Sequence, residues 1–164
     1  YGERYGFDPL LLAALAYQES GLDPSRESHR GAVGLMQLLP STAADPNVGI
    51  PDIAPVEANV HAGAKYLAFL RERYFTAPDI RTVDRNALTL AAYNAGPRRV
   101  REMRELAGEM GLDPKRWFGQ VEVAAGRIVG RETVDYVANI HKYYLAYRAG
   151  RELATRREAA REAH

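Results

Sequence analysis

The sequence predicts a single all-α domain. Its 164 residues are enough for one compact domain with a sizeable core and too few for two ordinary ones. The composition is rich in Ala, Leu, Arg and Glu, which favour helices, and the apolar residues recur mostly every three or four positions. We therefore expect helices throughout the chain, joined by loops that contain glycine and proline.

The first predicted helix is the stretch PLLLAALAYQES, residues 9–20. Asp8 before Pro9 is typical of an N-cap followed by a first helical residue, and Gly21 is a typical helix stop. Glu19 falls in the last turn of this helix. An acidic side chain thus follows a run of leucines and alanines.

A structured loop and a short helix are predicted next. The stretch GLDPSRESHRGAVG, residues 21–34, is dense in glycine, proline, serine and aspartate. The stretch LMQLLPSTA, residues 35–43, predicts a short helix that is interrupted at Pro40. We expect the loop to return the chain towards the first helix and to bring backbone groups close to Glu19.

Four further helices complete the predicted fold. The second of them is almost uncharged and should be buried nearly all round, while the third is strongly charged. The first and the last carry apolar stripes expected to face the core, namely Val56, Val60, Ala64, Leu67 and Leu70, and then Val137, Ile140, Tyr144 and Tyr147. These helices are predicted over residues 56–75, 86–97, 98–110 and 132–149.

The composition argues against several classes of partner. With 22 basic and 21 acidic residues the formal net charge is +1, so we expect no nucleic acid partner. There are no cysteines, which excludes disulfides and thiolate metal sites but leaves the compartment open. The longest apolar run, residues 9–17, is far shorter than the ~20 residues that span a bilayer. The sequence begins at Tyr1, so we expect any targeting segment to lie outside it.

Glu19 is the residue whose surroundings point to chemistry. A glutamate at a helix end is more often solvated or paired, and the helix dipole slightly disfavours it there. Here, however, the acid follows an apolar helix and precedes a glycine-rich return. Desolvation of the charged form raises the pKa of a carboxyl group and lets it remain a proton donor near neutral pH. Glu19 is therefore a candidate general acid.

Other catalytic arrangements are not found. The four histidines, His29, His61, His141 and His164, form no pair with metal-binding spacing, and DPNVGIPD lacks the ligand pattern of a calcium loop. There is also no Gly-x-Ser-x-Gly elbow and no phosphate-binding glycine loop. We expect no metal and no other cofactor.

Three further residues are candidates for ligand contacts. Tyr93 lies in AAYNAGP, where a helix end could direct its hydroxyl to a cleft, although most tyrosines at helical spacing are core residues. Glu132 and Tyr136 are one helical turn apart and could approach a ligand together. By spacing alone, they could equally be an ordinary exposed pair.

Four stretches, in order, carry a family resemblance: QES, ESHRGAVGLMQLLPSTA, AAYNAGP and ETVDYV. Together they resemble the catalytic domain of the soluble lytic transglycosylases, over about residues 8–148. The resemblance implies a goose-type-lysozyme-like helical fold with the active-site cleft beside the first long helix. It also implies cleavage of the β-1,4 bond between N-acetylmuramic acid and N-acetylglucosamine in peptidoglycan, leaving a 1,6-anhydro end. Residues 1–150 are then the catalytic domain and residues 151–164 a charged tail, which either extends the last helix or frays.

The resemblance also assigns roles to single residues. Glu19 matches the catalytic acid. Leu39 replaces a methionine that often lines the cleft, with a small expected effect because the volumes are similar. The positions that match glycan-binding or substrate-adjacent residues are Ser28, Gln37, Tyr93, Glu132 and Tyr136.

The stretches EANVHAGAKYL and LDPKRWF are similar to a membrane-bound branch of this family. In that branch the catalytic domain follows a solute-binding-protein-like domain and is exported to the inner face of the outer membrane. The resemblance thus implies a periplasmic location, peptidoglycan glycan strands as partner, and an upstream regulatory domain.

Glu19 is the one acid in a credible catalytic position. Ordinary glycosidases need two carboxyl groups, whereas a lytic transglycosylase uses the C6 hydroxyl of its own substrate as nucleophile. We therefore expect Glu19 to act first as acid and then as base. The alternatives are a hydrolytic muramidase, a peptidoglycan-binding module without catalytic activity, and a purely structural helical domain.

Overall fold

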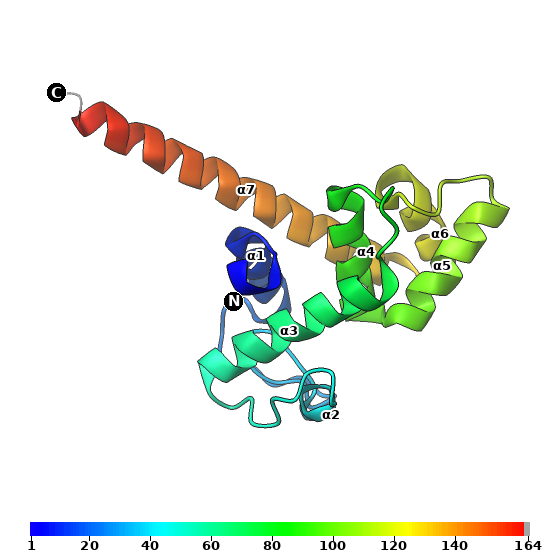
Figure 1. Cartoon of the computed structure of the whole chain (residues 1–164), viewed down its shortest axis with the longest axis horizontal. Helices are drawn as coiled ribbons and strands as arrows, with labels where there is room; N and C mark the ends of the chain where they lie inside the picture. Colours follow the sequence, from blue (N-terminus) through cyan, green and yellow to red (C-terminus); the bar gives the residue numbers. More distant parts are fainter. Residues whose placement is uncertain (163–164) are drawn as a thin grey trace.

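The computed structural model describes residues 1–162, and helices dominate it (Figure 1). The β-pairing in these residues consists of two isolated bridges, Glu27 with Val33 and Val33 with Leu38. The predicted all-α class is confirmed. In chain order the elements are the 3-10 turn η1 Glu3–Tyr5, α1 Pro9–Ser20, α2 Pro40–Ala44, α3 Val56–Tyr74, α4 Thr82–Ala95, α5 Pro97–Glu109, η2 Trp117–Val121, α6 Glu122–Ile128 and α7 Arg131–Glu162.

Helix α4 lies at the centre of the domain. It packs against α3, α5 and α7, and residues 87–92 along it are all buried, as their lack of charge predicts. Helix α1 packs along α7, and the N-terminal half of α7 completes the core (Figure 1). The largest fully buried side chains come from every part of the fold and include Leu15, Met36, Leu67, Leu88, Met103, Trp117 and Ile140.

Helix α1 has the limits that its sequence predicts. The Asp8 carboxylate accepts a hydrogen bond of 2.9 Å from the Leu10 amide, and Pro9 is the first helical residue. Gly21 ends the helix with a positive φ of 66°, in the left-handed region that favours glycine. Tyr144 donates a hydrogen bond of 2.9 Å to Asp8 and thereby fastens the start of α1 to α7.

The short helix predicted over residues 35–43 is wrong in its position. Helix α2 begins at Pro40 and is not interrupted by it, which agrees with the preference of proline for the first turn. The residues before it form turns because Val33 and Leu38 exchange two backbone hydrogen bonds of 3.1 and 3.3 Å. Gln37 has a φ of 44°, which no right-handed helix accommodates.

Two glycines let this loop approach α3 closely. A Cβ on Gly63 would lie 2.7 Å from the side chain of Met36, and one on Gly34 would lie 2.5 Å from the amide nitrogen of Asn59. The side-chain oxygen Oδ1 of Asn59 accepts a hydrogen bond of 2.8 Å from the Met36 backbone amide. These contacts hold the loop against α3 and fix its position in the fold.

Two other predicted details differ in the structure. Val56, expected in the core stripe of α3, is 50% exposed, because it is the first residue of the helix and lies beyond the core edge. Helix α4 begins at Thr82 rather than at residue 86, and its first turn contains the fully buried Asp84. Asp84 accepts hydrogen bonds from Arg81 and from the Trp117 amide, which allows this charge inside the domain.

Helix α7 continues past the predicted end at residue 149 and reaches Glu162. Of the two alternatives for the tail, the helical extension holds for residues 151–162, which are all exposed and project beyond the other helices (Figure 1). Residues 163–164 of the tail lie outside the described residues. In the part of the chain that the structure describes, no helix is both long enough and apolar enough to cross a membrane.

Candidate active site

A groove of about 620 Å³ opens beside the C-terminal end of α1. Its walls come from the end of α1, the loop between α1 and α2, helices α2 and α3, the end of α4 and the start of α7. Five of the six predicted site residues line it: Glu19, Ser28, Gln37, Tyr93 and Glu132. The fold thus brings together residues that are up to 113 positions apart, since the first is residue 19 and the last is residue 132.

Glu19 is half-buried and lines this groove. Burial is the main effect on its carboxyl group and raises the pKa from 4.5 to about 7, while a hydrogen bond from Tyr136 and the positive charge of Arg26 act in the opposite direction. A substantial fraction of the group is therefore protonated at neutral pH. This is the state that a general acid needs.

Tyr136 supports Glu19 from inside the domain. Its hydroxyl donates a hydrogen bond to Oε1 of Glu19, and the residue is only 6% exposed. It is the one predicted site residue that does not line the groove. Glu132 and Tyr136, which the sequence predicted to approach a ligand together, therefore have different surroundings. Glu132 is exposed and lines the groove, whereas Tyr136 is buried and contacts Glu19.

Ser20 fastens the loop to α1 next to the acid. Its hydroxyl lies 3.0 Å from the carbonyl oxygens of both Ala16 and Leu35 and can donate to either. Ala16 is in α1, like Ser20, and Leu35 is in the loop between α1 and α2. This link fixes the groove wall relative to Glu19.

Tyr93, near the end of α4, also lines the groove. Its hydroxyl donates a hydrogen bond of 2.8 Å to the Met36 carbonyl oxygen, and the Tyr66 ring lies 5.4 Å from its own. Burial, followed by the nearby charge of Glu19, raises the pKa of Tyr93 well above its usual value, so the hydroxyl stays neutral. Tyr93 lines the groove, which is compatible with the prediction that its hydroxyl faces a cleft. The hydroxyl proton, however, is donated to the Met36 carbonyl oxygen in the loop.

Ser28 and Gln37 shape the loop as well as the groove. The Ser28 hydroxyl oxygen accepts a bond of 3.0 Å from the Ala32 amide. The Gln37 side-chain nitrogen lies 2.9 Å from the Arg26 carbonyl oxygen and 3.0 Å from that of Gly34. Their positions in the groove thus depend on backbone contacts inside the loop.

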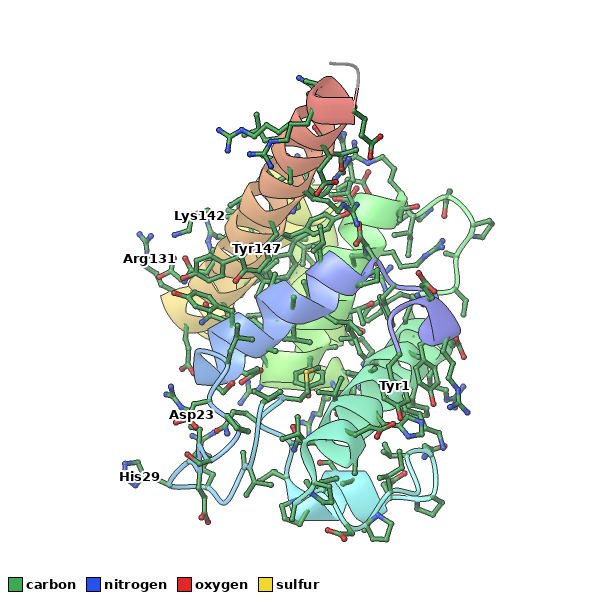
Figure 2. All side chains as sticks on the ribbon, turned by 90° about the vertical axis from the view of Figure 1, so that its left-hand side faces the viewer. Tyr1, Asp23, His29, Arg131, Lys142 and Tyr147 are labelled. Carbon is green, nitrogen blue, oxygen red and sulfur yellow. The ribbon has the colours of Figure 1, made fainter. Side chains whose placement is uncertain are left out.

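Sequence reasoning missed other residues in the groove, among them Tyr66, Asn94, His29 and Arg30. His29 lies at the tip of the loop between α1 and α2, on the outer edge of the molecule (Figure 2). Tyr66 is on α3 but off its predicted core stripe, so no local pattern marked it. Leu39 is 39% exposed and lines the same groove.

Among residues 1–162 no three histidine, aspartate or glutamate side chains are grouped so that they could hold a metal ion.

The comparison with known families identifies the domain. The family model described as the Transglycosylase SLT domain matches residues 1–113. This chain belongs to that family. The family resemblance that the motifs predicted is therefore confirmed.

Two curated relatives match this chain over most of its length. The membrane-bound lytic murein transglycosylase F of Desulfosudis oleivorans is 40% identical over 155 residues, covering 87% of this chain and 33% of the relative. The membrane-bound lytic murein transglycosylase F of Pseudomonas fluorescens is 33% identical over 157 residues, which covers 88% of this chain and 32% of the relative. These matches agree with the predicted membrane-bound branch. The chain spans about a third of the length of these relatives.

Solved SLT-family structures have the same helical architecture. An inactive Glu-to-Gln mutant of the lytic transglycosylase Slt from Pseudomonas aeruginosa superposes with a TM-score of 0.69 at 27% identity, covering 93% of this chain and 23% of that one. The 70 kDa soluble lytic transglycosylase from Escherichia coli gives a TM-score of 0.63 at 29% identity, with 90% and 23% covered. The predicted lysozyme-like fold is thus confirmed.

Proposed function

We propose that this domain is a lytic murein transglycosylase. It cleaves the β-1,4 bond between N-acetylmuramic acid and N-acetylglucosamine without water and leaves a 1,6-anhydromuramic end. The observation that carries this proposal is one half-buried acid in the groove lining, Glu19, whose pKa of about 7 suits proton donation. Membership of the SLT family supports the same reaction class.

Glu19 acts without a second catalytic carboxylate. The other acid in the groove lining, Glu132, is exposed at the start of α7, where water screens its charge. Hydrolysis by inversion or retention would need such a second carboxylate to activate water or to attack the sugar. We assign Glu132 to hydrogen bonding with the glycan instead. In the Slt relative from Pseudomonas aeruginosa a Glu-to-Gln mutant is inactive, which also supports dependence on one glutamate.

The reaction has two proton transfers through Glu19. First, the neutral carboxyl group donates its proton to the glycosidic oxygen, and the bond from that oxygen to the anomeric carbon of the muramic acid breaks. Then the C6 hydroxyl oxygen of the same sugar bonds to the anomeric carbon, and its proton passes to the Glu19 carboxylate. The acid is thereby restored. Because the nucleophile is tethered to the reacting ring, orientation can lower the barrier by roughly 7 kcal/mol or more.

The neighbouring hydroxyl groups support both protonation states of Glu19. Tyr136 donates to Oε1, and this bond stabilises the carboxylate that exists between the two transfers. The Tyr93 proton is bound to the Met36 carbonyl, so the phenol oxygen can present a lone pair to the positive charge that develops on the ring. Ser28 and Gln37, on the loop, are assigned to glycan contacts.

The substrate and the setting follow from the same proposal. The partner is the glycan strand of peptidoglycan. The relatives are named membrane-bound and are about three times as long as the match, which supports a periplasmic location at the outer membrane and an upstream solute-binding-like regulatory domain in the full-length protein.

The test is digestion of purified murein with the wild-type domain and with Glu19→Gln. We expect the wild type to release fragments lighter by one water than hydrolytic products, and the variant to fold and bind glycan but to lose at least ~10²-fold in turnover. Glu27→Gln, which changes an exposed glutamate in the adjacent loop, is the matched control and should keep full turnover. Near-normal turnover in Glu19→Gln would refute the assigned role.

A further inference from the structure

A separate pocket lies between α4 and α7, away from the groove. It measures about 280 Å³, and its walls come from α1, α4, η2 and α7. We call it the α4–α7 pocket and define it by six of the residues that line it, namely Leu11, Val83, Leu90, Phe118, Leu145 and Arg148. Among the described residues that line this pocket, none also lines the groove that contains Glu19. The α4–α7 pocket is therefore not part of the candidate active site.

The α4–α7 pocket is mostly apolar and has basic side chains in its lining. Val83 and Leu145 are 40% and 50% exposed, so apolar surface is open to a ligand there. His141 and the exposed Arg148 also line the pocket, whereas its described lining contains no aspartate or glutamate. The pocket thus suits an apolar group that has a negative charge beside it.

Contacts inside the fold hold the α7 wall of this pocket in place. The Tyr144 hydroxyl donates a hydrogen bond of 2.9 Å to Asp8, and the ring of His141 lies 4.9 Å from that of Phe118. Asp8, the acid that contacts this wall, is engaged by Tyr144 and does not line the pocket. A ligand would therefore meet a preformed apolar surface, which lowers the entropic cost of binding.

Positive charge and apolar surface continue along α7 beyond the pocket. Leu153 lies two helical turns after Leu145 and is 55% exposed. In this region α7 leaves the other helices and projects away from them (Figure 1). Residues 141–157 contain five lysines or arginines and one acid, a net charge of +4, whereas the whole chain has +1. The five basic residues are Lys142, Arg148, Arg151, Arg156 and Arg157.

We propose that the α4–α7 pocket and the basic part of α7 beyond it dock an acidic helix of a partner protein. A large apolar side chain of that helix fills the pocket, and a second one packs against Leu153. Acidic side chains beside them lie close to Arg148 and the arginines that follow it. Insertion of apolar anchors from one side of a helix is a common mode of recognition, and opposite charge adds specificity. This docking is a further function and does not depend on the reaction in the groove.

The charge and the shape of this surface favour such a partner over two other occupants. A second copy of the chain would bring the same basic stretch against residues 141–157, and like charges repel across an interface. A helix that lies in a bilayer surface needs a wide apolar face. Leu153 is the only large apolar residue within residues 149–162, so the projecting part of α7 lacks that face. An acidic helix fits both the pocket and the charge.

The test measures binding of a synthetic acidic helix to the whole chain. The probe is a fluorescent peptide of about 18 residues, long enough to form a helix, with leucines on one side and glutamates beside them. An analogue with lysine at each glutamate position reports the role of charge. Vesicles of phosphatidylcholine and phosphatidylglycerol report binding to a bilayer, and sedimentation of the protein alone reports self-association.

Two variants change the proposed surface, and each has a matched control. Arg148→Glu reverses a charge in the pocket lining, and its control is Arg101→Glu on α5. Arg148 and Arg101 are both exposed, and each pairs with the glutamate four residues later, at 3.8 and 3.9 Å. Leu145→Ser removes an apolar contact, and its control is Val123→Ser on α6, where the side chain is 44% exposed. Thermal unfolding checks that all four variants are folded.

We expect the acidic peptide to bind, the lysine analogue not to bind, and the affinity to fall as salt is added. Arg148→Glu and Leu145→Ser should each lower the affinity by roughly 3- to 10-fold, while the two controls keep it. Absence of saturable binding, or equal losses in variants and controls, would refute the proposal. Binding to vesicles but not to the peptide would overturn it in favour of a bilayer. Self-association that Leu145→Ser abolishes would overturn it in favour of a second copy.

Discussion

The raised pKa of Glu19 makes a testable prediction about stability. Burial favours the protonated carboxyl group in the folded state, with a pKa of about 7 against 4.5 for the ordinary group. A shift of this size corresponds to about 3 kcal/mol between the two protonation states, which partial exposure of the side chain reduces to roughly 2 kcal/mol. The folded domain therefore contains an unfavourably buried charge at high pH.

The sign of the effect follows from proton linkage. Because the folded pKa is raised, the stabilisation is fully present below about pH 4.5 and is lost as the pH rises through about 7. Glu19→Gln has no charge to bury, and its amide oxygen can still accept from Tyr136. The variant should thus match the wild type near pH 4 and exceed it by roughly 2 kcal/mol near pH 8.

Urea unfolding of both proteins over this pH range measures the difference directly. Subtraction cancels the titration of the other groups that the two proteins share. The control is again Glu27→Gln, whose difference from the wild type should vary little with pH because Glu27 is exposed. If the Glu19→Gln difference were also flat, Glu19 would not be a desolvated acid, and its role as proton donor at neutral pH would lose its physical basis.

Two further predictions concern the support of the acid and the packing of the loop. Tyr136→Phe removes a donor that stabilises the Glu19 carboxylate, so the pKa of Glu19 should rise, and the alkaline limb of the pH profile of turnover should move to higher pH. An unchanged limb would mean that this hydrogen bond does not tune the acid. Gly63→Ala places a Cβ 2.7 Å from the side chain of Met36, and overpacking should destabilise the domain by about 1–3 kcal/mol in urea unfolding. Gly126→Ala, where the new Cβ meets nothing within 4 Å, should be neutral or slightly stabilising; equal losses in both variants would contradict the packing argument.

The sequence could predict features whose causes are local. The start and end of α1 depend on Asp8, Pro9 and Gly21, all of which are adjacent to the helix ends. The burial of residues 87–92 in α4 follows from their own lack of charge. The position of α2 could not be predicted in this way, because the turn before it is held by Asn59, which is 23 positions from Met36.

The same distinction applies to the site. Glu19 could be found from its apolar helix and the glycine-rich return that follows it. Its bond with Tyr136 joins residues 117 positions apart, so spacing along α7 suggested a ligand contact where the structure has a buried support. The contact between the rings of Tyr66 and Tyr93 was also hidden, because α3 and α4 bring these two residues together only in the fold.

The central claim is that the nucleophile is the C6 hydroxyl of the substrate and not water. Digestion of murein in water labelled with heavy oxygen tests it most directly, with mass spectrometry of the released muramic ends. We predict that the ends form as 1,6-anhydro sugars and contain no heavy oxygen. Reducing ends that carry one heavy oxygen each would show hydrolysis and would contradict the account.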